Sequence, residues 1–390
     1  MPDPRIISVG LSPLGKTDLT GRDLFSAAFT EAFDGLPAPA EIVDAMYVGN
    51  QSEKYEHQIM YGTLLAEWCG LRYVPAERVE GCAAAGALAL KHATQDVRTG
   101  THDAVLACGV EKMTAGGTAG ATDSLSAAFD RALEQRSGIT APSQYALLAQ
   151  RYLHETDATE ENLARIAVKN HRNAAANPRA QYQHEIDLDT VLESDYIASP
   201  LKLFDCAPTT DGAAAVLVAN EEVASDLADR TEQIKISGVG GAANNLAVAE
   251  RNLTFIEGAN VAANRAYEEA GLSADEIDIA EVHDAFTVCE ALLAESVGFA
   301  PRGRGTETVL EPNERSSGWT DVHINTSGGL KARGHPIGAT GLAQAVEVYE
   351  QLTKTATPDR QVADATAGLL INEGGVTDAV TVAHVLEAGQ

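Results

Sequence analysis

Cys82 is the side chain of this sequence best placed to act as a nucleophile. It opens a run of small residues that is predicted to form a helix, Val79-Glu80-Gly81-Cys82-Ala83-Ala84-Ala85-Gly86. The N-terminus of a helix carries partial positive charge and free N–H groups, and both favour the thiolate, which is the reactive form. The small neighbours leave room for a thioester on the sulfur. A buried, inert thiol is the alternative interpretation of Cys82 taken alone.

His335 stands in a rigid frame of glycine and proline. The run reads Gly334-His335-Pro336-Ile337-Gly338-Ala339-Thr340-Gly341 and is followed by a predicted helix. A residue before proline is kept out of helical geometry, and the glycines permit a turn and close backbone approach. The pattern therefore predicts an imidazole at the end of an element, where it can meet a substrate.

Two further segments carry candidate polar groups after predicted strands. His283 follows the alternating run 277–282 and begins His283-Asp284-Ala285-Phe286, ahead of a helix predicted to reach Ser296. Strand ends in α/β layers commonly hold site residues, although a structural histidine is an equal alternative. Asn372-Glu373-Gly374-Gly375 follows the predicted strand 367–371, and its glycines would expose backbone N–H groups suited to an oxyanion. A plain tight turn is the alternative there.

The elements that must position these residues repeat along the chain. A helix after Cys82 leads to the predicted strand 104–108, and a helix from Gly338 to about Leu352 leads to the predicted strand 367–371. This indicates two equivalent α/β halves. Residues 116–198 differ, since they are rich in Gly and Thr at first and then polar and helical. They are interpreted as an inserted, mostly helical subdomain.

Composition excludes several classes of protein. The chain has 390 residues and a net charge of -28, with 56 acidic residues against 28 basic ones, so it would repel nucleic acid. The acids are spread along the chain, which favours a surface adapted to high salt over an ordinary acidic protein. No run reaches the ~18 apolar residues of a membrane span, and no secretory signal is visible, so a cytoplasmic protein is expected. The five cysteines lack a Cys-x-x-Cys pair, which predicts neither a disulfide framework nor a zinc site.

The chain resembles the thiolase family nearly end to end. The resemblance rests on the Cys82 helix, on the His335 run and on four more blocks: Gly109-Val110-Glu111-Lys112-Met113-Thr114, Asp211-Gly212-Ala213-Ala214-Ala215, His283-Asp284-Ala285-Phe286 and Asn325-Thr326-Ser327-Gly328-Gly329. Their form is similar to the archaeal and sterol-carrier-type branch, and the acidic composition is compatible with a haloarchaeal acetyl-CoA C-acetyltransferase.

The resemblance implies a fold and its divisions. It implies an α/β protein of two pseudo-equivalent halves in five layers, αβαβα, with a loop subdomain over the site. Residues 1–115 and 199–228 would form the N-terminal half, 116–198 the loop subdomain, and 229–390 the C-terminal half.

The resemblance also implies residue roles. Cys82 would take the acyl group as a thioester, and His335 would activate it and help to bind the thioester oxygen of the second substrate. His283 would contribute to the same oxyanion hole, and the backbone N–H groups of Cys82 and Gly374 would hold the oxyanion of the acylation step. Three more residues are candidates for lining the pocket: Phe286, Asn372 and Cys289.

One departure from the family concerns the acid/base group. Common thiolases carry a second cysteine where this chain has Asn372, and the sterol-carrier type carries one where this chain has Ala285. Our hypothesis is that Cys82, His283 and His335 work together, with one histidine as acid/base.

Acyl transfer between CoA thioesters is the leading expectation: two acetyl-CoA give acetoacetyl-CoA and CoA, or the reverse thiolysis. A decarboxylating condensation of the ketoacyl-synthase type and an acyl-CoA or lipid-binding subunit with little turnover are the alternatives. No metal or redox cofactor is expected beyond CoA thioesters as substrates. The resemblance implies a homodimer or tetramer, and a small OB-fold and zinc-ribbon partner protein. Lys112, Lys202 and Arg172 are candidates for contacts to CoA phosphates.

Overall fold

The computed structural model describes residues 2–310 and 314–389, so Met1, residues 311–313 and Gln390 lie outside the described residues. Ten strands form one continuous sheet in the order β10-β9-β11-β12-β8-β1-β7-β4-β2-β3. It divides between β1 and β8, which pair antiparallel through Arg5 with Lys235 and Ile6 with Ile234. Each side of this junction holds five strands.

The two groups of five strands have the same order and directions. The strands of the first group are β1 (Arg5–Leu11), β2 (Ala45–Gly49), β3 (Ala76–Val79), β4 (Ala104–Lys112) and β7 (Asp211–Ala219). Those of the second are β8 (Ile234–Ala243), β9 (Ile279–Glu281), β10 (His323–Ile324), β11 (Ala367–Gly374) and β12 (Val380–Ala388). In both, the second strand pairs parallel with the third and fourth, and the fifth pairs antiparallel with the fourth and the first. The predicted internal repeat is therefore real.

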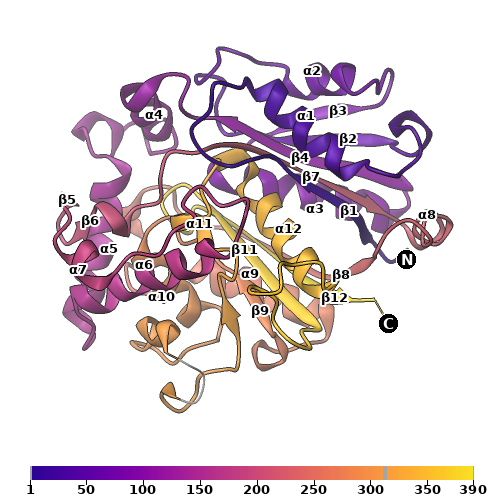
Figure 1. Cartoon of the computed structure of the whole chain (residues 1–390). Coiled ribbons are helices and arrows are strands. Elements are labelled where there is room, and N and C mark those ends of the chain that lie inside the picture. The colour runs from indigo at the N-terminus through magenta and orange to yellow at the C-terminus, as the bar shows by residue number, and fades with distance from the viewer. Residues whose placement is uncertain (1, 311–313, 390) are drawn as a thin grey trace.

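The helices complete five layers, which confirms the expected α/β architecture (Figure 1). Two central helices, α3 (Ala85–Thr99) and α12 (Thr340–Leu352), touch each other and contact strands of both groups. α1 (Gly21–Ala32) and α2 (Tyr61–Trp68) cover the outer face of the first group, and α9 (Glu257–Ala270) covers that of the second, with α10 (Thr287–Ser296) packed against α9.

Small side chains let the central helices pack closely. The buried residues of α3 include four alanines, Ala85, Ala87, Ala89 and Ala93. Because their side chains are single methyl groups, the helix axes can approach more closely than with larger side chains. The core divides accordingly into one apolar cluster around α3 and α12 and one under each outer helical layer. The central layer thus brings the N-termini of α3 and α12 together, and these carry Cys82 and the His335 run.

The segment between β4 and β7 is mostly helical and lies to one side of the layers, away from both chain ends (Figure 1). Its elements are α4 (Gly117–Ser126), α5 (Ala141–Glu155), α6 (Glu160–Ala175), α7 (Leu188–Leu192) and the hairpin of β5 (Tyr196–Ala198) and β6 (Leu201–Lys202). The short helices elsewhere include α8 (Glu221–Asp226), α11 (Gly329–Ala332) and the 3-10 turn η9 (Ile337–Ala339). The domain boundaries expected from the sequence stay a prediction.

Two strand ends differ from expectation. β11 continues through Asn372, Glu373 and Gly374, because β12 pairs with it to the end, Gly374 opposite Val380. From the sequence, this stretch was expected to follow the strand, either as backbone that binds an oxyanion or as a plain tight turn. β9 is shorter than the predicted strand 277–282, because its two partners, β10 and β11, pair with it over Ile279–Glu281.

Candidate active site

One cavity of about 360 Å³ brings Cys82, His283 and His335 together. Cys82 comes from the start of the α3 segment, His283 from the loop after β9, and His335 from the loop between α11 and α12. Residues of the loop subdomain and the neighbouring loop, among them Leu125 and Phe129, form the opposite wall. The cavity therefore lies where both halves and the inserted segment meet.

Cys82 has a left-handed backbone, with φ 52°, at the first position of the turn Cys82–Ala84. A positive φ in a residue with a side chain is uncommon and is found disproportionately at functional sites. The turn leads directly into α3, so the sulfur lies near the free N–H groups of a helix start. Cys82 is partly exposed, because it borders both this cavity and a neighbouring one.

Burial of the sulfur outweighs the hydrogen bonds that it receives. The backbone N–H groups of Gly375 and Ala83 lower the pKa of the Cys82 thiol, but desolvation raises it more, to about 11. The helix start alone therefore does not produce a thiolate, contrary to the expectation from sequence. Cys82 needs a neighbouring base to lose its proton.

Gly375 supplies one of the backbone N–H groups that reach the Cys82 sulfur, and it follows Gly374, the last residue of β11. Binding of an oxyanion by the N–H groups of Cys82 and Gly374 stays a prediction. The N–H of Cys82 itself donates to Glu80 Oε1 at 2.7 Å. An oxyanion at this position would therefore have to displace the Glu80 carboxylate.

His335 is held from two sides. Its backbone N–H donates to Thr210 Oγ1 at 2.9 Å, and its Nδ1 lies 2.7 Å from Thr340 Oγ1. Thr340 Oγ1 in turn donates to Pro336 O at 3.0 Å. Burial and the Arg333 charge lower the pKa of His335 to about 3, so its ring is neutral at physiological pH.

His283 faces His335, with ring centroids 5.1 Å apart and the ring planes nearly perpendicular. Its Nδ1 lies 3.0 Å from Asn372 Nδ2, which also donates to Gln344 Oε1 at 2.9 Å. Burial, then His335 and Arg333, hold the pKa of His283 well below its usual value. Both imidazoles are therefore neutral, which suits proton transfer and hydrogen bonding rather than charge pairing.

Two buried carboxylates fix the loops that carry the histidines. Asp284 accepts the backbone N–H groups of Leu330 and Lys331 in α11, the short helix before the loop that carries His335. Glu111 accepts those of Gln51 and Gly338, and so joins the first half of the protein to the His335 run. Both residues belong to the blocks on which the family resemblance rests.

The cavity wall is largely apolar, and an aromatic pair forms part of it. Phe286 stacks on Tyr145 with ring centroids 4.2 Å apart, and both line the cavity. Of the other two lining candidates, Asn372 contacts His283 from behind the wall, and Cys289 is fully buried, with its N–H donated to Phe286 O. Neither is among the residues that border the cavity in the described part of the chain.

Several contributing residues were not singled out from the sequence. Tyr145 and Gln344 come from the helices α5 and α12, and Thr210 comes from the loop directly before β7, and none of them has a motif that would mark it. Thr340 lies inside the His335 run, where its spacing of five residues from the histidine was the available signal.

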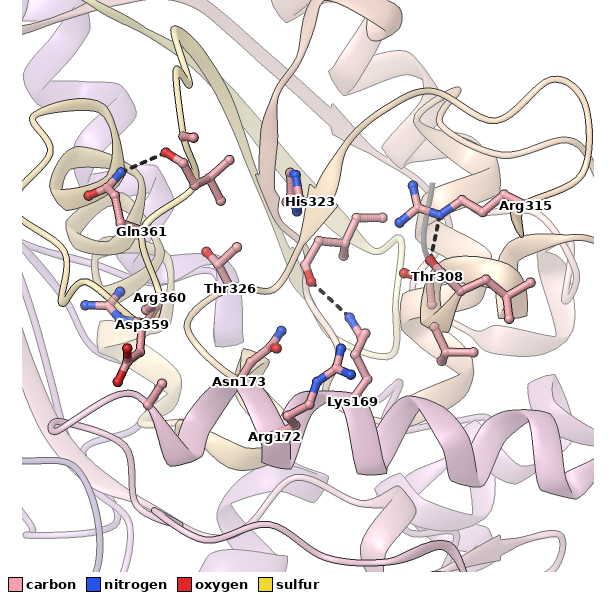
Figure 2. A pocket seen from close by; sticks show the side chains of 16 residues that line it. Lys169, Arg172, Asn173, Thr308, Arg315, His323, Thr326, Asp359, Arg360 and Gln361 are labelled. Carbon is pink, nitrogen blue, oxygen red and sulfur yellow. Dashed lines mark hydrogen bonds between the residues drawn. The ribbon is translucent and has the colours of Figure 1, made fainter. Parts of the chain in front are cut away.

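The three basic residues considered for CoA phosphates lie elsewhere or are already paired. Lys112 Nζ lies 2.5 Å from the buried Asp211 carboxylate. Lys202 donates to Leu192 O and lies over the Tyr196 ring. Arg172 lines a separate cavity of about 560 Å³ beside strand β10 (Figure 2). Across the described residues, His, Cys, Asp and Glu side chains form no group of three or more that could hold a metal ion.

Comparison with known proteins gives the family. The model of the thiolase N-terminal domain matches residues 5–222, and that of the thiolase C-terminal domain-like family matches residues 240–388. An acetyl-CoA acetyltransferase of Methanothermobacter thermautotrophicus is 39% identical over 99% of both chains, and one of Methanocaldococcus jannaschii is 37% identical over 99% of both. The benzoylsuccinyl-CoA thiolase subunit BbsB of Thauera aromatica is 34% identical over 89% of this chain and 88% of its own.

A solved structure described as an Ltp2-ChsH2(DUF35) aldolase has the same fold, with a TM-score of 0.80 and 23% identity over 99% of this chain and 98% of its own. Family models for both domains match nearly the whole chain, and full-length relatives share more than a third of its residues. The protein therefore belongs to the thiolase family of enzymes.

Proposed function

We propose that this thiolase is an acetyl-CoA C-acetyltransferase, which joins two acetyl-CoA into acetoacetyl-CoA and CoA or runs the reverse thiolysis. The observation that supports this most is the convergence of Cys82, His283 and His335 in one cavity. The full-length acetyl-CoA acetyltransferase relatives support acetyl-CoA as the substrate.

The reaction runs in two steps through an acyl-cysteine. In the first, a histidine takes the Cys82 proton, the sulfur attacks the acetyl carbonyl carbon, and CoA leaves with that proton as a thiol. In the second, a histidine removes a proton from the methyl carbon of a second acetyl-CoA. The resulting carbanion attacks the acetyl-Cys82 carbonyl, the C–S bond breaks, and Cys82 recovers its proton from the histidine. No other reactant is needed, and we propose that no metal or redox cofactor takes part.

Mass spectrometry of the intact and digested protein after incubation with acetyl-CoA tests the first step. We expect an acetyl group on the peptide that contains Cys82, and its loss in Cys82→Ala. Cys206 borders the same cavity, so Cys206→Ala is the matched variant and must keep the adduct on Cys82. An unmodified Cys82 under turnover conditions would favour a binding subunit instead.

Separate incubation with acetyl-CoA and malonyl-CoA tests the second step. Release of acetoacetyl-CoA from acetyl-CoA alone is expected. A decarboxylating condensation would give product only when malonyl-CoA is present, because loss of carbon dioxide then replaces proton removal.

Pairing of two copies at strand β3 is the assembly that we propose. β3 is the last strand of the sheet, and large apolar side chains close to it in sequence are exposed: Ile59, Met60, Trp68 and Tyr73. Edge strands and apolar patches of this kind are typical of interfaces. Light scattering should give at least twice the chain mass, and Met60→Asp with Tyr73→Asp should give one chain mass.

A small partner protein is a further proposal. The name of the fold neighbour, Ltp2-ChsH2(DUF35) aldolase, suggests a complex with a second component. We propose a comparable small OB-fold and zinc-ribbon partner here. Full activity of the purified chain, with no small protein captured by it from its own host, would argue against the partner.

A cytoplasmic location is proposed on the basis of the substrates. Within the residues that the structure describes, no helix combines the length and apolar character needed to cross a bilayer.

A further inference from the structure

The two histidines of the cavity differ in what holds their Nδ1 atoms. A neutral imidazole has one N–H and one bare nitrogen, so the partner of Nδ1 decides what Nε2 can do. Thr340 holds Nδ1 of His335, and Asn372 holds Nδ1 of His283. In both rings this leaves Nε2 as the nitrogen available to a ligand in the cavity.

The proton on His335 lies at Nδ1. Thr340 Oγ1 has a single hydrogen and lies 3.0 Å from Pro336 O, which can only accept. With that hydrogen on Pro336 O, the bond that a threonine in a helix commonly makes to the carbonyl four residues before it, Thr340 Oγ1 accepts from His335 Nδ1–H at 2.7 Å. His335 therefore presents a bare Nε2, which can accept a proton.

The proton on His283 lies at Nε2. The amide nitrogen of Gln344 faces two backbone carbonyls, Glu281 O at 3.3 Å and Ile371 O at 3.5 Å, so its oxygen must face Asn372. Asn372 then directs its own nitrogen at Gln344 Oε1, and the second hydrogen of that nitrogen points at His283 Nδ1. Turning the Asn372 amide over would place two oxygens together and leave a buried N–H group without an acceptor.

We propose that Asn372, oriented by Gln344, is a positioning residue that fixes His283 as a hydrogen-bond donor through Nε2–H, so that His335 alone acts as the base. This rests on the proposed function and deepens it. Asn372 stands where the common family members have their second cysteine, and here it supports the oxyanion donor instead of moving a proton. His283 donates to the thioester oxygen of the second acetyl-CoA, while His335 Nε2 takes the proton from its methyl carbon.

The proton assignments can be read directly by nitrogen NMR of the full-length protein labelled with ¹⁵N-histidine. Long-range proton–nitrogen spectra distinguish a protonated from a bare ring nitrogen, and His283→Gln and His335→Gln identify the two signals. We expect a bare Nδ1 and protonated Nε2 in His283, and the reverse in His335. The same tautomer in both rings would overturn the proposal, whatever the enzymatic activity.

Asn372→Leu keeps the volume of the side chain and removes its donor. Loss of a complete oxyanion donor costs about 10²–10³ in kcat, and a mixture of tautomers in His283 should cost about tenfold. Acetylation of Cys82 should keep its rate, because His283 acts only on the second substrate, and this retained step also reports a folded protein. If Asn372→Leu lost both Cys82 acetylation and the condensation step, Asn372 would not act through His283 alone. If turnover were unchanged, Asn372 would have no role in catalysis.

Asn372→Asp should change how turnover depends on pH. The carboxylate raises the pKa of His283 and holds its proton at Nδ1. Below the raised pKa the doubly protonated ring still donates through Nε2, and above it Nε2 is bare. Turnover of this variant should therefore fall as pH rises through that pKa, whereas the wild type shows no such fall.

The matched control is Asn260→Asp, since Asn260 donates to Ser296 O on the outer helical layer. It should keep the wild-type pH profile. A pH profile of Asn372→Asp identical to that of the wild type would overturn the proposal.

Discussion

At the scale of residues, the site depends on groups kept neutral by burial. Cys82 is a thiol with its pKa raised to about 11, and His335 is an imidazole with its pKa lowered to about 3. A proton can pass between the two, but neither carries a charge at rest that would have to be solvated in an apolar cavity. Catalytic charge therefore appears only during the reaction.

This neutrality predicts an unusual pH profile. A base must be unprotonated, and a lowered pKa keeps His335 unprotonated to lower pH than an ordinary histidine. The rate of Cys82 acetylation by acetyl-CoA should stay level between about pH 5 and 8. Rapid-quench measurement across this range, with circular dichroism to confirm folding, checks it. A fall on the acid side with a midpoint near 6.5 would show that burial does not control the base.

At the scale of elements, glycines allow the two central helix starts to approach. A Cβ on Gly341 would lie 2.6 Å from Ala87 N, and one on Gly86 would lie 2.8 Å from Gly338 O. Real Cβ atoms do not come this close to backbone, so these positions have no room for a side chain. The close approach sets the distance between Cys82 and His335, which lie beside these contacts.

Gly341→Ala should therefore separate α3 from α12. We expect a loss of about 1–3 kcal/mol in the free energy of unfolding, together with slower Cys82 acetylation. Urea unfolding followed by circular dichroism measures the first effect. The control is Gly120→Ala in α4, where a Cβ meets nothing within 4 Å and alanine should be neutral or stabilising. Equal unfolding midpoints for Gly341→Ala and the wild type would refute the packing argument.

The two edges of the sheet differ in whether side chains bind their backbone carbonyl groups. At the β10 end, Lys169 donates to Ile324 O at 2.9 Å, and Arg315 donates to Val322 O at 3.2 Å. Figure 2 shows both of these basic side chains beside the strand that carries His323. These side chains occupy edge carbonyls that another strand would otherwise use. At the β3 end, none of the described side chains binds the carbonyls of Ala76–Val79 in this way. The contrast favours β3 as the edge that pairs in the proposed dimer.

At the scale of the whole molecule, charge is the dominant feature. A net charge of -28 creates mutual repulsion in the folded state. Exposed carboxylates contribute to it on several elements, for example Glu161, Asp187, Asp189, Glu268 and Glu269. Salt weakens the attraction within buried ion pairs, such as Arg333 with Glu281, much less than it weakens the repulsion between these exposed carboxylates.

Salt should therefore stabilise the protein. The Debye length falls from about 10 Å at 0.1 M to about 3 Å at 1 M, so the thermal unfolding midpoint should rise with KCl over this range. Differential scanning calorimetry measures the midpoint, and sucrose, which is uncharged, serves as the control for exclusion from the surface. A midpoint independent of KCl would remove the interpretation of a salt-adapted surface.

The sequence by itself determined the two-half α/β fold, the thiolase family and the segments that carry the site. Helix periodicity, buried strand runs and the glycine frame of His335 act over a few residues, so they can be read along the chain. The tertiary structure decided what depends on distant segments: the extension of β11 by β12, the burial that reverses the expected pKa shift of Cys82, and the approach of the Gly375 N–H to the sulfur. It also decided that Asn372 and Cys289 stand behind the wall, and that Gln344 orients Asn372. Desolvation and hydrogen-bond direction arise only when residues far apart in the chain pack together, and no local pattern records them.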